Sequence, residues 1–365
     1  GMLLVNPYFY ILKITPTLLV YLGGLRLLSY IKFFNPSKRN LGVKKKHIIV
    51  MSLISSLICG QAVHANSTKE PQNNGLNDKT EPGLLKQIKP ELLYSYVDFN
   101  FNSTQDTNYN RFQGYSNIAA VGADNITLRK DLLAGLYYFN VTTSFNSQSL
   151  LMPFTVNQSQ QTINNNTIFG HVLKTFNPNW YMDLAGGYGQ NKLTLLTATQ
   201  TPLPFEANTH NDNWFVSLNA LYRKTWTDFI LKANVGAFYS QINTGPYQFV
   251  AIDQSLSQPV PALVNKATLI MENAELGYNL NPELVPFING GLIQVAQFSN
   301  SRPVVSAVIN GSLPQLNLNK NGFRLGAGIT FKHKQLSLRL EEKYYNSAGT
   351  FISYQTFLGL EYQFT

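Results

Sequence analysis

Three histidines follow residue 65, and their side chains are the ones best suited to acid–base or nucleophilic chemistry: His171, His210 and His333. A hydrolase would place such an imidazole beside an Asp, with or without a Ser nucleophile. His333 is expected in a tight turn and His210 in a loop, and no spacing of Ser, His and Asp supports such a site. The sequence also lacks a phosphate-binding glycine loop and a Cys/His metal spacing. We therefore predict no enzyme, with no catalytic residue, cofactor or metal.

Ten charged residues form a second set, because each lies in a segment where polar and apolar side chains alternate. They carry both signs, so opposite charges could form ion pairs on one face of a sheet. If that face lines a closed sheet, the mixed charges predict ion-paired packing of the interior rather than a strongly selective pore. The ten residues are Asp98, Asp183, Arg223, Lys232, Glu275, Arg324, Arg339, Glu341, Lys343 and Glu361.

The clearest of these segments is 351–364, since side chains on a strand point alternately to opposite faces. One face is almost wholly apolar and ends on two aromatic residues, and the other is polar or small. A strand that crosses a bilayer needs about 9–11 residues and carries aromatic residues at the interfaces. We interpret this segment as the closing strand of an outer-membrane β-barrel. The apolar face comprises Ile352, Tyr354, Thr356, Leu358, Leu360, Tyr362 and Phe364.

The composition agrees with long strands that are polar on one side. Only 13% of the residues are charged, against a usual share of about 25%, while 20 Tyr and 23 Phe are present. Residues 1–65 hold eight Lys or Arg and no acid, which leaves 20 basic and 19 acidic residues in the rest of the chain. The formal charge of +9 therefore belongs to the N-terminal segment and does not indicate nucleic-acid binding.

Twelve alternating segments predict an all-β, 12-stranded antiparallel transmembrane barrel over residues 91–365. Because hydrocarbon cannot satisfy unpaired backbone groups, residues 92–101 must pair with the last segment. Short periplasmic turns opposite long external loops are typical of bacterial barrels, and this parity places both barrel ends in the periplasm. The segments are 91–102, 113–128, 131–146, 162–176, 179–195, 212–226, 228–243, 264–280, 284–298, 321–332, 334–346 and 350–364. The long loops are 103–112, 147–161, 196–211, 244–263 and 299–320.

The N-terminal part divides into three regions. Residues 43–65 combine a basic start, a short apolar run and a small-x-small end, which predicts a signal peptide cleaved after Ala65. A lipoprotein site at Cys59 is the weaker alternative, because bulky residues precede it. Residues 1–42 are an uncertain upstream extension. Residues 66–90 are a flexible linker with a possible short helix, which would form either a periplasmic tail or a short plug in the barrel.

The chain resembles the translocator (β) domain of autotransporters. The resemblance rests on twelve segments, on residues 114–124 as a second strand, and on the terminal Gly359, Tyr362 and Phe364. It implies that these three residues form the assembly signal that the barrel assembly machinery reads, although Thr365 follows the last aromatic. The family exports an N-terminal passenger through its pore, whereas residues 66–90 are too short for a folded passenger.

These observations predict a bacterial outer-membrane barrel without a sizeable passenger, which acts as a pore or as a surface scaffold. The alternative is an adhesin or surface-interaction protein that binds through its long loops 244–263 and 299–320, because loops on a rigid scaffold often carry function. The expected partners are outer-membrane lipid, lipopolysaccharide and the barrel assembly machinery, with no nucleic acid. We expect export through the periplasm after cleavage near Ala65.

Overall fold

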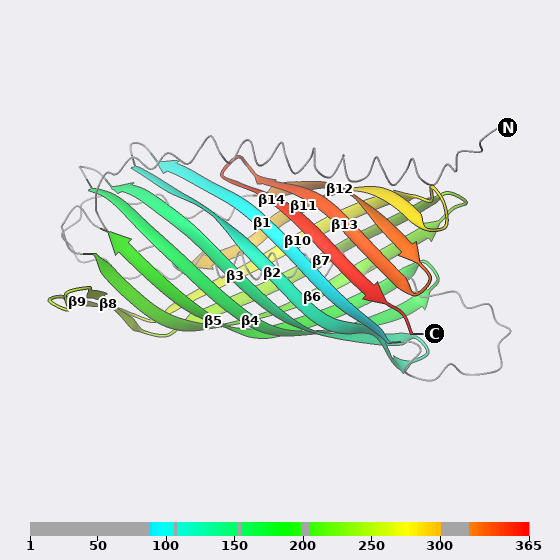
Figure 1. The fold of residues 1–365 in the computed structure, drawn as a ribbon, viewed down its shortest axis with the longest axis horizontal. Helices are drawn as coiled ribbons and strands as arrows, with labels where there is room; N and C mark the ends of the chain where they lie inside the picture. The colour runs from blue at the N-terminus through cyan, green and yellow to red at the C-terminus, as the bar shows by residue number, and fades with distance from the viewer. Residues whose placement is uncertain (1–87, 106–107, 152–154, 199–203, 301–320, 365) are drawn as a thin grey trace, which may run out of the picture. The chain divides into compact units, whose positions relative to one another are not determined.

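The structure is a computed structural model that describes residues 88–105, 108–151, 155–198, 204–300 and 321–364, all within one compact unit of the chain. Twelve long strands of this part form a barrel (Figure 1). Within these ranges no helix is long and apolar enough to cross a membrane. The strands are β1 Lys89–Gln105, β2 Asn108–Arg129, β3 Leu132–Leu151, β4 Thr155–Asn177, β5 Trp180–Ala198, β6 Phe205–Thr225, β7 Phe229–Thr244, β10 Leu263–Tyr278, β11 Leu284–Asn300, β12 Gly322–His333, β13 Leu336–Ser347 and β14 Phe351–Tyr362.

The barrel closes through antiparallel pairing of its first and last strands. Residues 91–101 of β1 pair with residues 351–361 of β14, and β5 pairs with β6 to complete the circle. The predicted fold class and the predicted closure are therefore confirmed. Closure leaves no barrel strand with an open edge at membrane depth, where an unpaired backbone group would have no water to bind.

Most of the N-terminal predictions lie outside the described residues. This applies to the upstream extension 1–42, to the signal peptide 43–65 and to the linker as far as residue 87. The predicted end of the linker at residue 90 is wrong, because Lys89 and Pro90 already belong to β1, where they pair with β2. The first barrel strand thus begins two residues earlier than its alternation pattern indicates.

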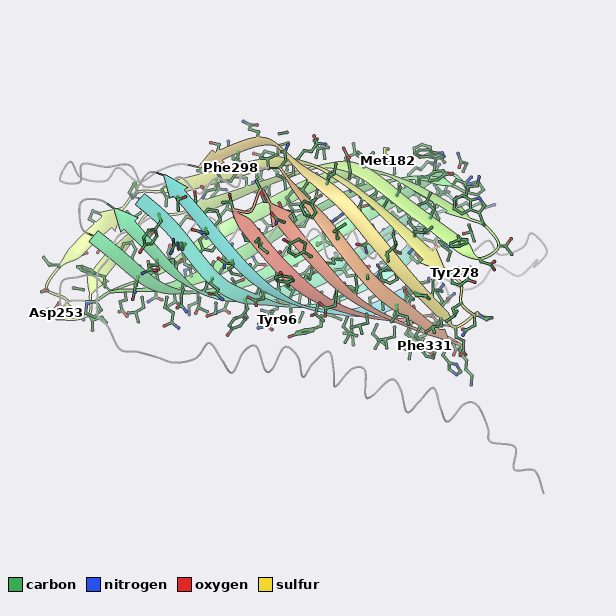
Figure 2. All side chains as sticks on the ribbon, turned by 90° about the horizontal axis from the view of Figure 1, so that it is seen from above. Tyr96, Met182, Asp253, Tyr278, Phe298 and Phe331 are labelled. Atoms are coloured by element: carbon green, nitrogen blue, oxygen red, sulfur yellow. The ribbon has the colours of Figure 1, made fainter. Side chains whose placement is uncertain are left out.

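The outer face of the barrel carries an apolar band between two sets of aromatic rings. Figure 2 labels Met182, Tyr278 and Phe331 on this outward face. Aromatic belts of this kind mark the two interfaces of a membrane-spanning barrel. Near the short turns the ring pairs are Trp180–Tyr222, Phe229–Tyr278 and Tyr362–Phe364. Toward the opposite end they are Tyr96–Tyr115, Trp214–Tyr239 and Tyr344–Tyr354.

Three segments that the sequence predicts as long loops are largely strand. The segments 103–112, 147–161 and 196–211 extend β1–β6 instead, with only residues 106–107, 152–154 and 199–203 left undescribed. Next to these extensions, polar side chains on the outer face bond across neighbouring strands, and one of them, Asn208, lies within an extension. The bonds are Asn140 Nδ2 to Asn166 Oδ1 (2.9 Å), Thr142 Oγ1 to Asn164 Oδ1 (3.1 Å) and Thr194 Oγ1 to Asn208 Oδ1 (3.0 Å). Polarity alone is a poor sign of a loop, because polar residues also fit a solvated sheet face.

The predicted loop 244–263 contains a β-hairpin, formed by β8 Tyr247–Ala251 and β9 Ser257–Val260. It lies at the barrel end opposite the C-terminus (Figure 1). Tyr247, Phe249 and Val260 are buried on one side of the hairpin and pack into the main apolar cluster. At its tip Ser255 donates to Asp253 from both its hydroxyl and its backbone, which lowers the pKa of the Asp253 carboxyl.

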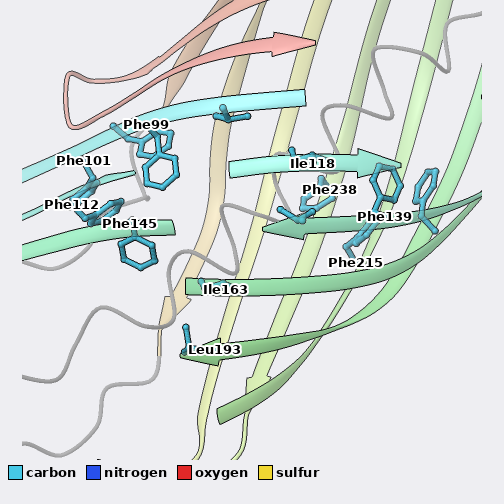
Figure 3. Packing of buried hydrophobic residues seen from close by; sticks show 14 of the residues in the cluster. Phe99, Phe101, Phe112, Ile118, Phe139, Phe145, Ile163, Leu193, Phe215 and Phe238 are labelled. Atoms are coloured by element: carbon cyan, nitrogen blue, oxygen red, sulfur yellow. The ribbon is translucent and has the colours of Figure 1, made fainter. Parts of the chain in front are cut away.

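The inner wall of the barrel carries many aromatic rings as well as polar groups. Figure 3 shows Phe139, Phe215 and Phe238 among the buried apolar side chains of this wall. Phe169 stacks on Phe215 with ring centroids 5.8 Å apart, although β5 lies between their strands. This contact is possible because Gly187 of β5 has no side chain: a Cβ there would lie 2.5 Å and 2.7 Å from two carbons of the Phe215 ring.

Replacing Gly187 with valine is therefore expected to destabilise the barrel. The Phe215 ring cannot move away freely, because Phe169 and Phe238 stack on it, and overpacking of this kind costs about 1–3 kcal/mol. Urea unfolding followed by tryptophan fluorescence would measure the loss. The adjacent Gly186→Val is the matched control, since a Cβ at Gly186 has only an ordinary contact of 3.4 Å with the Phe215 carbonyl oxygen. Equal stability of both variants would contradict the packing argument.

Candidate functional site

The structure brings most of the predicted charged residues together on the inner wall. Asp183, Glu275, Arg324, Arg339, Glu341 and Lys343 are buried there, and Arg223, Lys232 and Glu361 share the same inward alternation. Asp98 is the exception and corrects the sequence prediction. It alternates with buried Val97 and Phe99, and so it faces outward, with Tyr115 and Tyr354 as its neighbours across the strands. A carboxylate is tolerated at this height because aromatic rings of this type mark the membrane interface.

Arg339 of β13 is the centre of the inward charges. Its Nη2 atom lies 2.6 Å from Glu275 Oε2 and 2.9 Å from Glu341 Oε2, and its guanidinium carbon is 3.8 Å from the centre of the Phe287 ring. Lys232 Nζ contacts Glu275 Oε1 at 3.0 Å, and Lys343 Nζ lies 3.4 Å from Glu341 Oε1. The guanidinium fork suits two carboxylates at once. Charges of both signs are thus paired within one network.

The network spans strands that are not neighbours in the sheet, because β12 presents small residues to the interior. Glu275 lies on β10 and Arg339 on β13, with β11 and β12 between them. A Cβ at Gly328 of β12 would clash with the Phe287 ring and with the Leu340 carbonyl oxygen. The glycine therefore leaves the space in which Arg339 crosses β12 and stacks on Phe287 of β11.

A cavity of about 120 Å³ lies beside this network, on the side of the short turns. Lys89 and Glu361 line it and form an ion pair of 3.1 Å across the β1–β14 closure. Arg223, Lys232 and Arg339 line it as well. Five basic and three acidic residues line the cavity, so charges of both signs are present and the net charge is positive.

His171 forms a second buried charge cluster that the sequence does not reveal. Its Nδ1 lies 2.8 Å from Asp183 Oδ1 on β5, and its Nε2 lies 3.3 Å from Asp124 Oδ1 on β2. The imidazole therefore lies between two buried carboxylates, one near each ring nitrogen. The ring reaches β2 because Gly135 of β3 has no side chain, since a Cβ there would clash with the ring. The inward parity shared by Asp124, Gly135, His171 and Asp183 is the only signal in the sequence for this cluster.

The other histidines differ from the prediction in their positions. His210 belongs to β6 and not to a loop, and His333 is the last residue of β12, so that the turn is formed by Lys334 and Gln335. His333 Nδ1 contacts Glu283 Oε1 at 2.7 Å. Across the described ranges, no group of three or more His, Cys, Asp or Glu side chains is arranged to hold a metal ion.

The three residues of the predicted assembly signal lie at the end of β14 and just beyond it. Gly359 faces the interior beside the charged cavity. Tyr362 and Phe364 are exposed on the outer face, with their ring centroids 5.3 Å apart. Recognition of these residues by the assembly machinery stays a prediction.

Comparison with known proteins agrees with this architecture. The family described as autotransporter beta-domain matches residues 96–341, which is more than half of the chain. The chain belongs to the autotransporter beta-domain family. No curated protein matches the sequence. The match places the barrel in the bacterial outer membrane, whereas the cleavage near Ala65 stays a prediction.

Solved structures of autotransporter beta-domains share the fold at low sequence identity. The translocator domain of NalP from Neisseria meningitidis has a TM-score of 0.61 and 12% identity, and the match covers 86% of this chain and 98% of that one. The beta domain of the Bordetella autotransporter BrkA has a TM-score of 0.50 and 14% identity, covering 76% and 100%. The transport unit of AIDA-I from Escherichia coli has a TM-score of 0.50 and 10% identity, covering 85% and 98%.

Proposed function

We propose that this autotransporter beta-domain acts as a surface scaffold, which holds a polar β-wall outside the bilayer. The observation that carries the proposal is the length of the strands on one side of the barrel. β2, β3 and β4 have 22, 20 and 23 residues, whereas a strand needs about 9–11 residues to cross a membrane. By contrast, β12, β13 and β14 have 12 residues each.

The chemistry of the long strands supports this proposal. Their outer faces change from apolar residues near the short turns to Asn and Thr residues that bond across the strands toward the other end. Such a hydrogen-bonded polar surface suits water and not hydrocarbon. The extended wall therefore stands above the membrane on the side opposite the short turns.

A scaffold fits the inner wall better than an open pore does. Phe139, Phe169, Phe215 and Phe238 pack against one another along this wall, and packed rings offer no hydrogen bonds to a hydrated solute. The adhesin function is a variant of the scaffold in which the outer loops bind a partner; the folded hairpin at 244–263 supports it, while 299–320 lies mostly outside the described residues.

Cysteine labelling on intact cells tests the scaffold. The single native cysteine, Cys59, is first replaced by serine, and single cysteines are then introduced by Asn164→Cys and Thr194→Cys. Both positions are exposed or partly exposed on the polar outer face, so a membrane-impermeant maleimide is expected to label them.

Leu218→Cys and Leu358→Cys are the matched controls. Both leucines point outward within the apolar band, so lipid is expected to protect them until the membrane is dissolved. Labelled controls, or unlabelled cysteines at the two polar positions, would show that the wall does not stand outside the bilayer.

A further inference from the structure

The outer end of β6 separates from its neighbour and forms a notch. β6 pairs with β7 only as far as Asn211, which lies opposite Thr244. Farther along, Phe205 and Glu206 pair with Ala251 and Val250 of the hairpin strand β8. Between these two contacts, residues 207–210 pair with β5 on one edge and with no described strand on the other.

The notch is a cavity of about 580 Å³, within the range of about 300–1,000 Å³ that is usual for small-molecule sites. The Glu206–Val250 pairing closes one end, and Gly245 and Pro246 line it near the turn that leads from β7 into β8. A site closed in this way does not admit an extended peptide, which needs a continuous strand edge. It suits a compact ligand.

The polar groups in the notch are free to bind. Glu206, Asn208 and His210 alternate along β6 and are exposed on its outer face, and Gln248 of β8 lines the same cavity. The Asn208 and Gln248 side-chain oxygens accept bonds from Thr194 and Ser257, which leaves both amide NH₂ groups available. Within the described chain, the Glu206 carboxylate and the His210 ring have no partner.

The lining also limits the charge and the shape of a ligand. Glu206 is its single carboxylate, and the residues that line the notch include no Lys or Arg. An anionic ligand such as a lipid phosphate is therefore disfavoured. Pro246, Tyr247 and Val250 add an apolar side to the cavity.

We propose that this notch binds a neutral saccharide of one or two rings. A carboxylate accepts hydrogen bonds from hydroxyls, an imidazole accepts or donates them, and amide NH₂ groups donate them. The C–H face of a pyranose matches the apolar side of the cavity. The inference rests on the proposed scaffold function, because it requires the end of β6 to face the exterior. Neutral saccharides would then be the ligands of the surface that the scaffold displays.

Saturation-transfer-difference NMR on the full barrel, folded in a detergent without sugar groups, tests the proposal. The probes are lactose and N,N′-diacetylchitobiose. We expect saturable transfer to at least one of them. Glu206→Gln combined with His210→Ala is expected to weaken its binding by about ten-fold or more, because two hydrogen-bonding partners are removed.

Two further variants keep the result interpretable. Gln248→Leu alters the notch from β8 and is expected to weaken binding as well, even if the double variant folds poorly. Asp212→Asn lies on the same strand outside the lining and is expected to bind like the wild type. No transfer to either sugar, or equal binding in the notch variants, would overturn the proposal. If Asn164→Cys and Thr194→Cys are labelled and no sugar binds, the saccharide site fails while the scaffold stands.

Discussion

Replacing Arg339 with alanine is expected to lower the free energy of unfolding by about 3–5 kcal/mol, the usual effect of breaking a buried ion pair. The change leaves Glu275 and Glu341 buried without the guanidinium that bonds to both. It also removes the cation that stacks on Phe287. Urea unfolding in lipid vesicles, followed by the fluorescence of the three tryptophans, would measure the loss.

Arg129→Ala is the matched control for this measurement. Arg129 also contacts a carboxylate, that of Asp131 at 3.2 Å, but its side chain is 73% exposed. An exposed pair contributes about 0–1 kcal/mol, so this variant is expected to unfold like the wild type. Similar small losses for both arginine variants would mean that the inner network does not stabilise the barrel.

Replacing His171 with leucine is expected to have a comparably large effect, also about 3–5 kcal/mol, because it breaks a second buried charge cluster. Asp124 and Asp183 would then face an apolar side chain, although both are almost fully buried. The same unfolding measurement reports the loss. Heat-modifiable migration on gels would show whether the variant still reaches the barrel state.

Neutralising the two carboxylates should restore part of this stability. In the triple variant with Asp124→Asn and Asp183→Asn, no charge is left buried without a partner, and amides cost less to bury than carboxylates. A His171→Leu variant as stable as the wild type would contradict the assigned role of the cluster. A triple variant no better than the single one would show that packing of the ring, and not charge, is decisive.

The alternation of side chains is sufficient to predict the twelve barrel strands and their closure. In β14 the residues Tyr354, Leu358 and Tyr362 are exposed while Phe357 is fully buried, as a period of two requires. Most of the inward charges follow from the same period. Asp98 is the exception: it has the same parity as Leu92 and Tyr94 and so faces outward with them, although its charge alone favours an inward position.

Alternation cannot predict where a strand leaves the membrane and enters water, or which side chains from non-neighbouring strands make contact. The polar ends of β1–β6 resemble loops by composition, although their inner face keeps the period in buried apolar residues such as Phe112 and Ala207. The hairpin β8–β9 has strands of five and four residues, too short for a clear pattern. The His171 cluster and the Arg339 network connect non-neighbouring strands. Alternation shows which face each side chain lies on, but not which side chains on that face make contact.

The inward glycines have a consequence for how the barrel assembles. Gly135, Gly187 and Gly328 have no side chain, so side chains from the two flanking strands come into contact above each of them. A β-hairpin inserted alone would therefore have its backbone ladder but not its final side-chain order. For example, the His171 ring on β4 lacks its partner Asp183 until β5 is added beside β4. We therefore expect the last steps of insertion to be strongly cooperative. A strand that slips by two residues would lose its side-chain contacts with the strands two positions away in the sheet, and so would be destabilised.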